Sequence, residues 1–199
     1  AFDIMTGAPA WRYETGNQIN SSGILSNGVL YFGSNDGYIY AVDAADGELI
    51  WKKEIGSYIS SSPLFWQDTL FFGSDDDCVY ALDCDSHEER WRYETGGNVD
   101  SSPLVVNGLL IVGSDDDCLY ALDPKSGDER WTFQTGGDIN SSPASLGDKL
   151  YVGSIDDYLY CVDVNSGMLN WRYKTGSNVD SSPLVRGKTV YVGSDDGFL

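Results

Sequence analysis

The chain has 199 residues, of which 41% are hydrophobic and 13% aromatic, a composition that suits one folded domain and argues against disorder. Its formal net charge of −19 at pH 7 would repel a phosphate backbone or an anionic membrane surface, so nucleic acid is excluded as a class of partner. No apolar run approaches the roughly 18 residues that a membrane-spanning helix needs, and we expect no membrane span.

A repeat of 40 residues runs through the whole chain without insertion or deletion. Tryptophan, glycine and aspartate mark it at fixed positions. The residues are Trp11, Trp51, Trp91, Trp131 and Trp171; Gly33, Gly73, Gly113, Gly153 and Gly193; and Asp36, Asp76, Asp116, Asp156 and Asp196. Self-similarity at a period of this length indicates an array of equivalent structural units.

Each repeat contains four short runs of strand-forming residues separated by turn signals. In the unit that starts at Ser101 the predicted strands are 101–106, 109–114, 118–123 and 129–135. The first turn is the pair Asn107-Gly108, which favours a type I′ hairpin because both residues tolerate positive φ. The second turn is acidic, at 115–117, and the third passes through Gly127. One repeat therefore predicts a four-stranded antiparallel sheet.

A sheet of this size cannot bury both of its faces, so the units must stack on one another. Radial stacking of four-stranded units gives a β-propeller. We predict an all-β fold of five four-stranded antiparallel blades in a single domain over residues 1–199. The repeat units cover approximately 20–59, 60–99, 100–139 and 140–179, with 1–19 joined to 180–199 as the fifth.

The two ends of the chain fall inside the same predicted strand. Residues 1–3 align with 41–43 and residues 198–199 with 38–39, so that one position, equivalent to Tyr40, is missing between them. A closed ring of five blades would build this strand from both ends and would remove open sheet edges. The alternative is that the five blades are part of a longer array of seven or eight.

The run A-x-D-x-x-[TSD]-G-x-x-x-W recurs in the chain. It occurs at 1–11, 41–51 and 121–131, and Cys161 replaces the alanine in the run that ends at Trp171. This pattern resembles the tryptophan-docking motif of the PQQ-like β-propeller repeat. That repeat occurs in quinoprotein alcohol dehydrogenases and in the propeller lipoprotein of bacterial outer-membrane assembly. The resemblance covers the whole chain and implies a periplasmic, secreted or cell-surface location.

The motif also has a physical interpretation. Each aspartate at the end of a third strand can accept backbone N–H groups of the turn, and the glycine takes a positive φ that most residues resist. The resemblance implies that each indole then packs on the adjacent blade. The predicted docking residues are Asp3, Asp43, Asp83, Asp123 and Asp163; Gly7, Gly47, Gly127 and Gly167; and the five repeated tryptophans.

One repeat departs from this motif. His87, the only histidine of the chain, stands where the other units have glycine. Histidine is one of the better tolerated residues at positive φ, so we expect a strained turn in an intact blade. Its place in an outer turn argues against a role as general base or metal ligand.

The resemblance raises one catalytic alternative, a fragment of a PQQ-dependent dehydrogenase. Family members that bind the quinone have two adjacent cysteines in a disulfide, whereas this chain has separate cysteines at Cys78, Cys84, Cys118 and Cys161. The near-perfect repeat also leaves few irregular loops, where an active site would be built. We expect no enzyme, no catalytic residues, and no PQQ or other cofactor.

Acidic residues gather in two sets of loops that a propeller places on one face. They form a candidate interaction face of Asp36, Asp75, Asp77, Asp100, Asp115, Asp117, Asp138, Asp157, Asp180 and Asp195. The only candidates for cation binding are Asp76, Asp116, Asp156 and Asp196, and we expect no metal there. Calcium needs about six to eight converging oxygens, and consecutive aspartates on a tight turn diverge. The acidic turns are therefore interpreted as turn-forming and solubilising residues, with calcium possible but unsupported.

We predict a non-catalytic, monomeric scaffold that binds a protein or peptide, with a basic segment as one candidate, through this acidic face. A glycan-binding propeller is a second alternative, because aromatic residues such as Tyr38, Tyr58 and Tyr158 could stack on sugars. Equivalent pockets would need repeated aromatics, however, and Trp66 has no counterpart in the other repeats.

Overall fold

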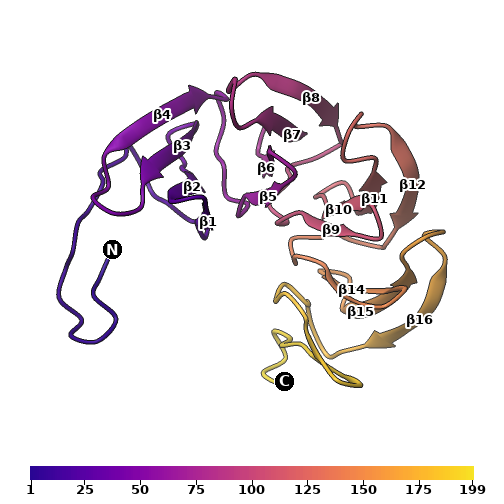
Figure 1. Cartoon of the computed structure of the whole chain (residues 1–199). Coiled ribbons are helices and arrows are strands. Elements are labelled where there is room, and N and C mark those ends of the chain that lie inside the picture. The colour runs from indigo at the N-terminus through magenta and orange to yellow at the C-terminus, as the bar shows by residue number, and fades with distance from the viewer.

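The computed structural model describes residues 1–199 and contains strands and turns but no helix (Figure 1). The strands form four sheets of four strands and one sheet of two, and every pairing is antiparallel. No helix is therefore available that is long and apolar enough to cross a membrane. The all-β class and the antiparallel sheets agree with the sequence prediction.

Each sheet follows the repeat. The first holds β1 (Ile24–Ser26), β2 (Val29–Gly33), β3 (Tyr38–Asp43) and β4 (Leu49–Glu54), and the second holds β5 (Leu64–Trp66), β6 (Thr69–Ser74), β7 (Cys78–Asp83) and β8 (Glu89–Glu94). The third holds β9 (Leu104–Val106), β10 (Leu109–Gly113), β11 (Cys118–Leu122) and β12 (Glu129–Gln134). The fourth holds β13 (Ala144–Leu146), β14 (Lys149–Ser154), β15 (Tyr158–Asp163) and β16 (Leu169–Lys174), and the last pairs β17 (Leu184–Arg186) with β18 (Thr189–Tyr191).

The turn between the first two strands of a sheet has the predicted backbone. Asn107 and Gly108 have φ values of 50° and 77°, as a type I′ hairpin requires. The second sheet achieves the same turn without glycine, since Gln67 and Asp68 have φ values of 46° and 58°. Register is therefore conserved between repeats even where the preferred turn residues are replaced.

The first strand of each sheet is shorter than the sequence predicts. In the third sheet it begins at Leu104, after the Ser-Ser-Pro step, because proline has no N–H to donate. The serines instead join successive sheets. The N–H of Ser22 donates to Ser62 Oγ at 2.8 Å, and the same contact links Ser62 to Ser102, Ser102 to Ser142 and Ser142 to Ser182 at 2.9, 3.0 and 2.9 Å.

The hydrophobic core lies between sheets rather than inside one layer. The cluster between the second and third sheets joins Phe71, Val79 and Trp91 to Leu110 and Leu122. Equivalent clusters of nine buried residues connect the first sheet with the second and the third with the fourth. Each unit therefore buries its faces only against its neighbours, as a propeller-like array requires.

The sheets follow one another around an open arc, with β4, β8, β12 and β16 on its outer side (Figure 1). The N-terminal segment lies at one end and β17–β18 at the other (Figure 1). Residues 1–3 make no pairing with β18, and the only bridge in the N-terminal segment joins Phe2 to Pro9. The third strand shared by both ends, predicted for a closed five-bladed ring, is therefore not formed.

Candidate interaction surface

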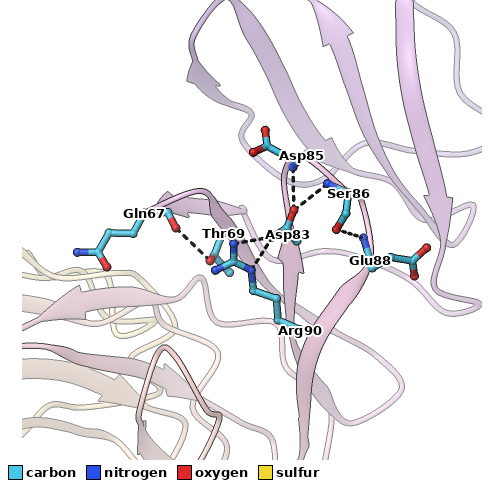
Figure 2. Close-up of polar contacts among 7 residues, drawn as sticks. All are labelled: Gln67, Thr69, Asp83, Asp85, Ser86, Glu88 and Arg90. Atoms are coloured by element: carbon cyan, nitrogen blue, oxygen red, sulfur yellow. Dashed lines mark hydrogen bonds and ion pairs between the residues drawn. The ribbon is translucent and has the colours of Figure 1, made fainter.

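The turn between the third and fourth strands is organised around its first aspartate. Figure 2 shows Asp83 Oδ1 accepting the N–H groups of Asp85 at 3.0 Å and Ser86 at 2.7 Å. Its Oδ2 accepts from Arg90 Nε at 3.0 Å and from Nη2 at 2.6 Å. These donors, the Ser86 backbone first and then Arg90, hold the pKa of Asp83 well below its ordinary value.

The same turn recurs along the chain. Asp123 accepts the N–H of Lys125 at 2.8 Å and of Ser126 at 3.3 Å, and pairs with Arg130 at 2.6 Å. Its pKa is lowered chiefly by the Arg130 hydrogen bond. Equivalent backbone contacts to Oδ1 occur at Asp3, Asp43 and Asp163. The predicted aspartates thus all sit at the start of this turn, exposed or half-buried, and cap its backbone.

At Gly47, Gly127 and Gly167 the turn glycine lies directly beneath the indole of the preceding unit. A Cβ on Gly47 would lie 2.4 Å from Trp11 Cε3, and one on Gly167 would lie 2.7 Å from Trp131. The indole N–H groups of Trp11, Trp91 and Trp131 donate to backbone carbonyls of the next unit at 3.0, 3.2 and 2.9 Å. Each of these tryptophans therefore joins two adjacent units.

His87 replaces the glycine in the second sheet, and its φ of 61° keeps the turn geometry. Its imidazole stacks on Trp51 with ring centroids 4.6 Å apart and an interplanar angle of 29°. The sequence identified the positive φ but gave no sign of this stacking. An aromatic side chain here replaces the close backbone approach that glycine allows in other units.

The fifth tryptophan has no following turn. Trp171 is 42% exposed, whereas Trp91 is 9% exposed. At the other end of the arc, Gly7 has a φ of 69° and nothing within 4 Å of its Cβ position. Trp171 and Gly7 therefore do not form the tryptophan–glycine contact that joins the other units.

The central aspartate of each acidic turn is occupied by structural contacts. Asp116 Oδ2 accepts the hydroxyl of Tyr120 at 2.6 Å and the N–H of Gly96, in the preceding linker, at 2.6 Å. The same tyrosine contact occurs at Asp36, Asp76 and Asp156, and the same glycine contact at Asp36, Asp156 and Asp196. Burial and then the hydrogen bond to Asp156 raise the pKa of Tyr160 to about 12. Three of the four candidates for a cation site, Asp116, Asp156 and Asp196, thus tie the turns to the linkers, whereas Asp76 accepts only from Tyr80 of its own sheet.

The acidic turns and the linkers between units lie against one another, as the candidate face required. The hydroxyl of Thr95 donates to the carbonyl of Asp77, and the N–H of Asp115 donates to Asn98 in the linker, at 2.8 and 2.9 Å. Most of the predicted face residues are half-buried here, while Asp180 and Asp195, near the end of the arc, are exposed. The structure therefore places the acidic turns in contact with the linkers between units.

Carboxylates crowd at these contacts. Burial, followed by the negative charge of Asp100, raises the pKa of both Asp75 and Asp115 to about 6. Burial is also the first cause that raises the pKa of Asp117 and of Asp180. The sequence located these acids but could not show which of them face one another.

Five buried side-chain oxygens accept no hydrogen bond from the protein, and all belong to these turns and linkers. They are the Oδ1 atoms of Asn35, Asp75, Asp76, Asp115 and Asn140. No group of three or more His, Cys, Asp or Glu side chains is arranged to hold a metal ion. These acceptors are buried and lie in separate places, so they form no shared site.

Known proteins resemble this chain over most of its length. A family model described as outer membrane protein assembly factor BamB matches residues 1–83, 35–146 and 119–199. BamB from Moraxella catarrhalis is 24% identical and superposes with a TM-score of 0.83 over 96% of this chain and 60% of its own. No curated protein sequence matches the chain.

Two other solved structures share the fold. The computationally designed Ika8 protein is 16% identical, with a TM-score of 0.87 over 99% of this chain and 62% of its own. The quinohemoprotein alcohol dehydrogenase ADHIIG from Pseudomonas putida HK5 is 20% identical, with a TM-score of 0.74 over 86% of this chain and 36% of its own. The chain spans less than two thirds of the length of each. With a family model matching along the whole sequence, the chain belongs to the PQQ-like β-propeller family described as outer membrane protein assembly factor BamB.

Proposed function

We propose that the chain is a non-catalytic scaffold whose acidic turns and linkers bind a basic segment of another protein. The observation that supports this most is that the negative charges of that surface form no ion pairs within the chain. The four ion pairs of the structure use Asp83, Glu88, Glu89 and Asp123, which all lie in or next to the outer turns. No aspartate of the candidate face has a Lys or Arg partner within the chain.

The crowded carboxylates support the same proposal. An ammonium or guanidinium group beside Asp75 or Asp115 would relieve repulsion from Asp100. A face of one charge sign also attracts an oppositely charged partner over distance. The family description, an assembly factor of outer membrane proteins, favours a protein partner and an extracytoplasmic location.

A PQQ enzyme is the alternative that the alcohol dehydrogenase relative raises. The residues present do not fit the quinone site of that family, because the four cysteines are separate and free. The two largest cavities, of about 560 and 540 Å³, both lie toward the C-terminal end of the arc, one lined by residues such as Tyr191 and Leu199 and the other by Tyr151 and Trp171. We derive no reaction from such a site. Incubation with PQQ and calcium should yield no oxidation of alcohols or sugars, and turnover of either would refute the scaffold proposal.

The arc also suits a ring of more than five blades. Superposition on BamB and on Ika8 covers 96% and 99% of this chain but only 60% and 62% of those two structures. An arc with that curvature leaves its ends apart, as Figure 1 shows. We therefore favour the larger ring over closure of five blades on themselves.

Binding of a synthetic peptide of lysine, arginine and glycine tests the function. We expect affinity to fall about tenfold or more between about 50 mM and about 300 mM salt, because the contacts are between charges. Isothermal titration calorimetry gives this salt dependence directly.

A matched pair of triple variants locates the surface. D75N/D115N/D117N removes three charges from the acidic turns, and E48Q/D85N/E88Q removes three from the outer turns. The first should weaken peptide binding about tenfold and flatten the salt dependence, and the second should change little. Equal effects of the two variants, or binding insensitive to salt, would refute the proposed surface.

A further inference from the structure

A pocket between the second and third sheets brings together residues that break the repeat. It has a volume of about 360 Å³ and is lined by Trp66, Gln67, Gly108, Asp123, Pro124 and Lys125. Both sheets have neighbours on either side in the arc (Figure 1). The pocket lies at the opposite end of the strands from the acidic turns, since it is built from the turns β5–β6, β9–β10 and β11–β12. Its volume falls in the range of small-molecule sites, roughly 300–1,000 Å³.

Trp66 is the first departure from the repeat, because it is the one tryptophan outside the spacing of 40 residues. The equivalent residues of the other units are Ser26, Val106, Leu146 and Arg186. Trp66 ends β5 and is half-buried against the cluster between the second and third sheets. Its indole N–H donates to no atom of the chain and is not among the buried groups without a partner. The pocket therefore has an aromatic platform with a donor open to solvent.

Pro124 is the second departure, and it leaves a backbone acceptor without a partner. In the other units the residue at this position donates its N–H to a carbonyl of the first hairpin turn. These bonds join Ala44 to Gly28, Cys84 to Asp68 and Val164 to Asp148, at 2.9, 3.0 and 2.9 Å. Proline has no N–H, so the Gly108 carbonyl lacks this bond and accepts none from elsewhere in the chain. Gly108 is exposed and lines the pocket.

Lys125 is the third departure, in a position held by Ala45, Asp85 and Asn165 in the other units. It is exposed and belongs to none of the four ion pairs. The exposed side chain of Gln67 points away from the pair of Asp83 and Arg90 (Figure 2). Asp123, in contrast, is held by Arg130 and by the turn N–H groups. The free polar groups of the pocket are thus donors and acceptors without an excess of negative charge.

This combination suits a sugar ring better than an apolar side chain. The C–H groups on one face of a pyranose can stack on the indole of Trp66, whose ring face carries partial negative charge. The hydroxyl groups around the ring both donate and accept, so one can donate to the Gly108 carbonyl while another accepts from Lys125 or Gln67. An apolar side chain would cover the indole equally well but would leave the Gly108 carbonyl desolvated and without a donor, which is unfavourable.

We propose that this pocket binds one neutral pyranose unit of an oligosaccharide, stacked on Trp66 and hydrogen-bonded to the Gly108 carbonyl. It is a single site in the chain, not one site for each repeat. It is also independent of the basic segment proposed for the acidic turns. Because only one ring is contacted, we expect a dissociation constant on the order of 1 mM.

Fluorine NMR of the chain labelled with 5-fluorotryptophan tests this proposal, with the Trp66 resonance assigned by W66F. The probes are maltotriose, cellotriose, mannotriose, galactotriose and triacetylchitotriose, each titrated to about 20 mM, well above the expected dissociation constant. At least one should shift the Trp66 resonance with saturation. The shift should change little between low and high salt, because the bound sugar carries no charge.

Three variants locate the contacts, with affinity measured by saturation-transfer difference NMR of the sugar. W66V introduces the residue that the next unit has at this position, so the sheet should fold while binding weakens about tenfold or more. Y58A removes an aromatic side chain that is 51% exposed in a linker outside the pocket, and binding should not change. P124A restores an N–H that competes for the Gly108 carbonyl, and binding should weaken about threefold or more.

The proposal would be overturned if none of the trisaccharides shifted the Trp66 resonance, or if W66V and Y58A bound equally well. Unchanged affinity in P124A would contradict the contact with Gly108. A proline-rich peptide that saturates the Trp66 shift where no sugar does would assign the pocket to a peptide instead. W66V should keep the salt-dependent binding of the basic peptide, and D75N/D115N/D117N should keep sugar binding, so the failures of the two proposals are distinguishable.

Discussion

Aspartates of this chain do two opposite things, depending on the donors around them. In the outer turns, Asp83 and Asp123 accept backbone N–H groups and an arginine, which lowers their pKa values. In the inner acidic turns, Asp75 and Asp115 are partly buried beside other carboxylates, which raises theirs to about 6. At neutral pH, ionised aspartates therefore stabilise the outer turns and destabilise the acidic turns.

The variants D75N and D115N should stabilise the protein at about pH 8. A pKa raised from 3.8 to about 6 means that the folded chain holds this proton more tightly than the unfolded chain. The stability from that proton is present below about pH 4 and is lost as pH rises through about 6. Replacing the ionised carboxylate should gain about 0.5 kcal/mol after allowance for solvent screening, and the gain should vanish near pH 4. Urea unfolding across this pH range measures it.

D123N provides the control of opposite sign. A pKa held below its ordinary value stabilises the folded chain above pH 4, and this contribution is lost as pH falls through the lowered value. D123N should therefore destabilise the protein at about pH 8 and should differ less from the parent chain in acid. A loss of stability in all three variants at about pH 8 would contradict the assignment of crowded and capped aspartates.

The sequence located most of these residues but not their partners. The spacing of 40 residues places every aspartate in its turn, because local turn chemistry repeats with the sequence. It cannot show that Asp75 and Asp115 both face Asp100, since the first contact crosses from one unit to the next and the second joins a linker to a turn 15 residues later. The stacking of Trp51 on His87 was missed for the same reason.

At the scale of the sheets, the repeated tryptophan is the main contact between units. Trp91 is nearly buried between Phe71 and the turn at Gly127, while Trp171 is half exposed. W91A should lower the free energy of unfolding by about 3–5 kcal/mol, the usual cost of removing a large buried aromatic side chain. W171A should lower it by only about 1–2 kcal/mol, because the Trp171 indole is already 42% exposed.

Guanidinium unfolding of both variants distinguishes the two positions. Similar losses for W91A and W171A would show that the indoles do not join the units. The four-strand pattern itself was predictable from turns such as Asn107-Gly108, whose positive φ values were confirmed. The start of each first strand was not, because in the Ser-Ser-Pro step the second serine's N–H bonds to the neighbouring sheet, while the first serine bonds to its own sheet through its side chain.

At the scale of the whole molecule, the curvature of the arc could not be predicted from the sequence. The repeat phase of residues 1–3 and 198–199 permits a closed five-bladed ring, yet the sheets form an open arc that superposes on part of larger structures. Local patterns determine each sheet, whereas the angle between sheets depends on how side chains such as Trp91 and Phe71 pack across the interface. Small differences in that packing accumulate around the array.

The central claim is that repeated indoles wedge each sheet against the next and leave one indole without a partner at the end of the arc. Fluorine NMR of the chain labelled with 5-fluorotryptophan tests it most directly, with each resonance assigned by a Trp→Phe variant. In dilute solution we expect the resonance of Trp171 to respond most strongly to a soluble paramagnetic probe among the five repeated positions, and that of Trp91 least. Equal protection of Trp171 and Trp91 in dilute solution, or equal exposure of all five, would contradict the account.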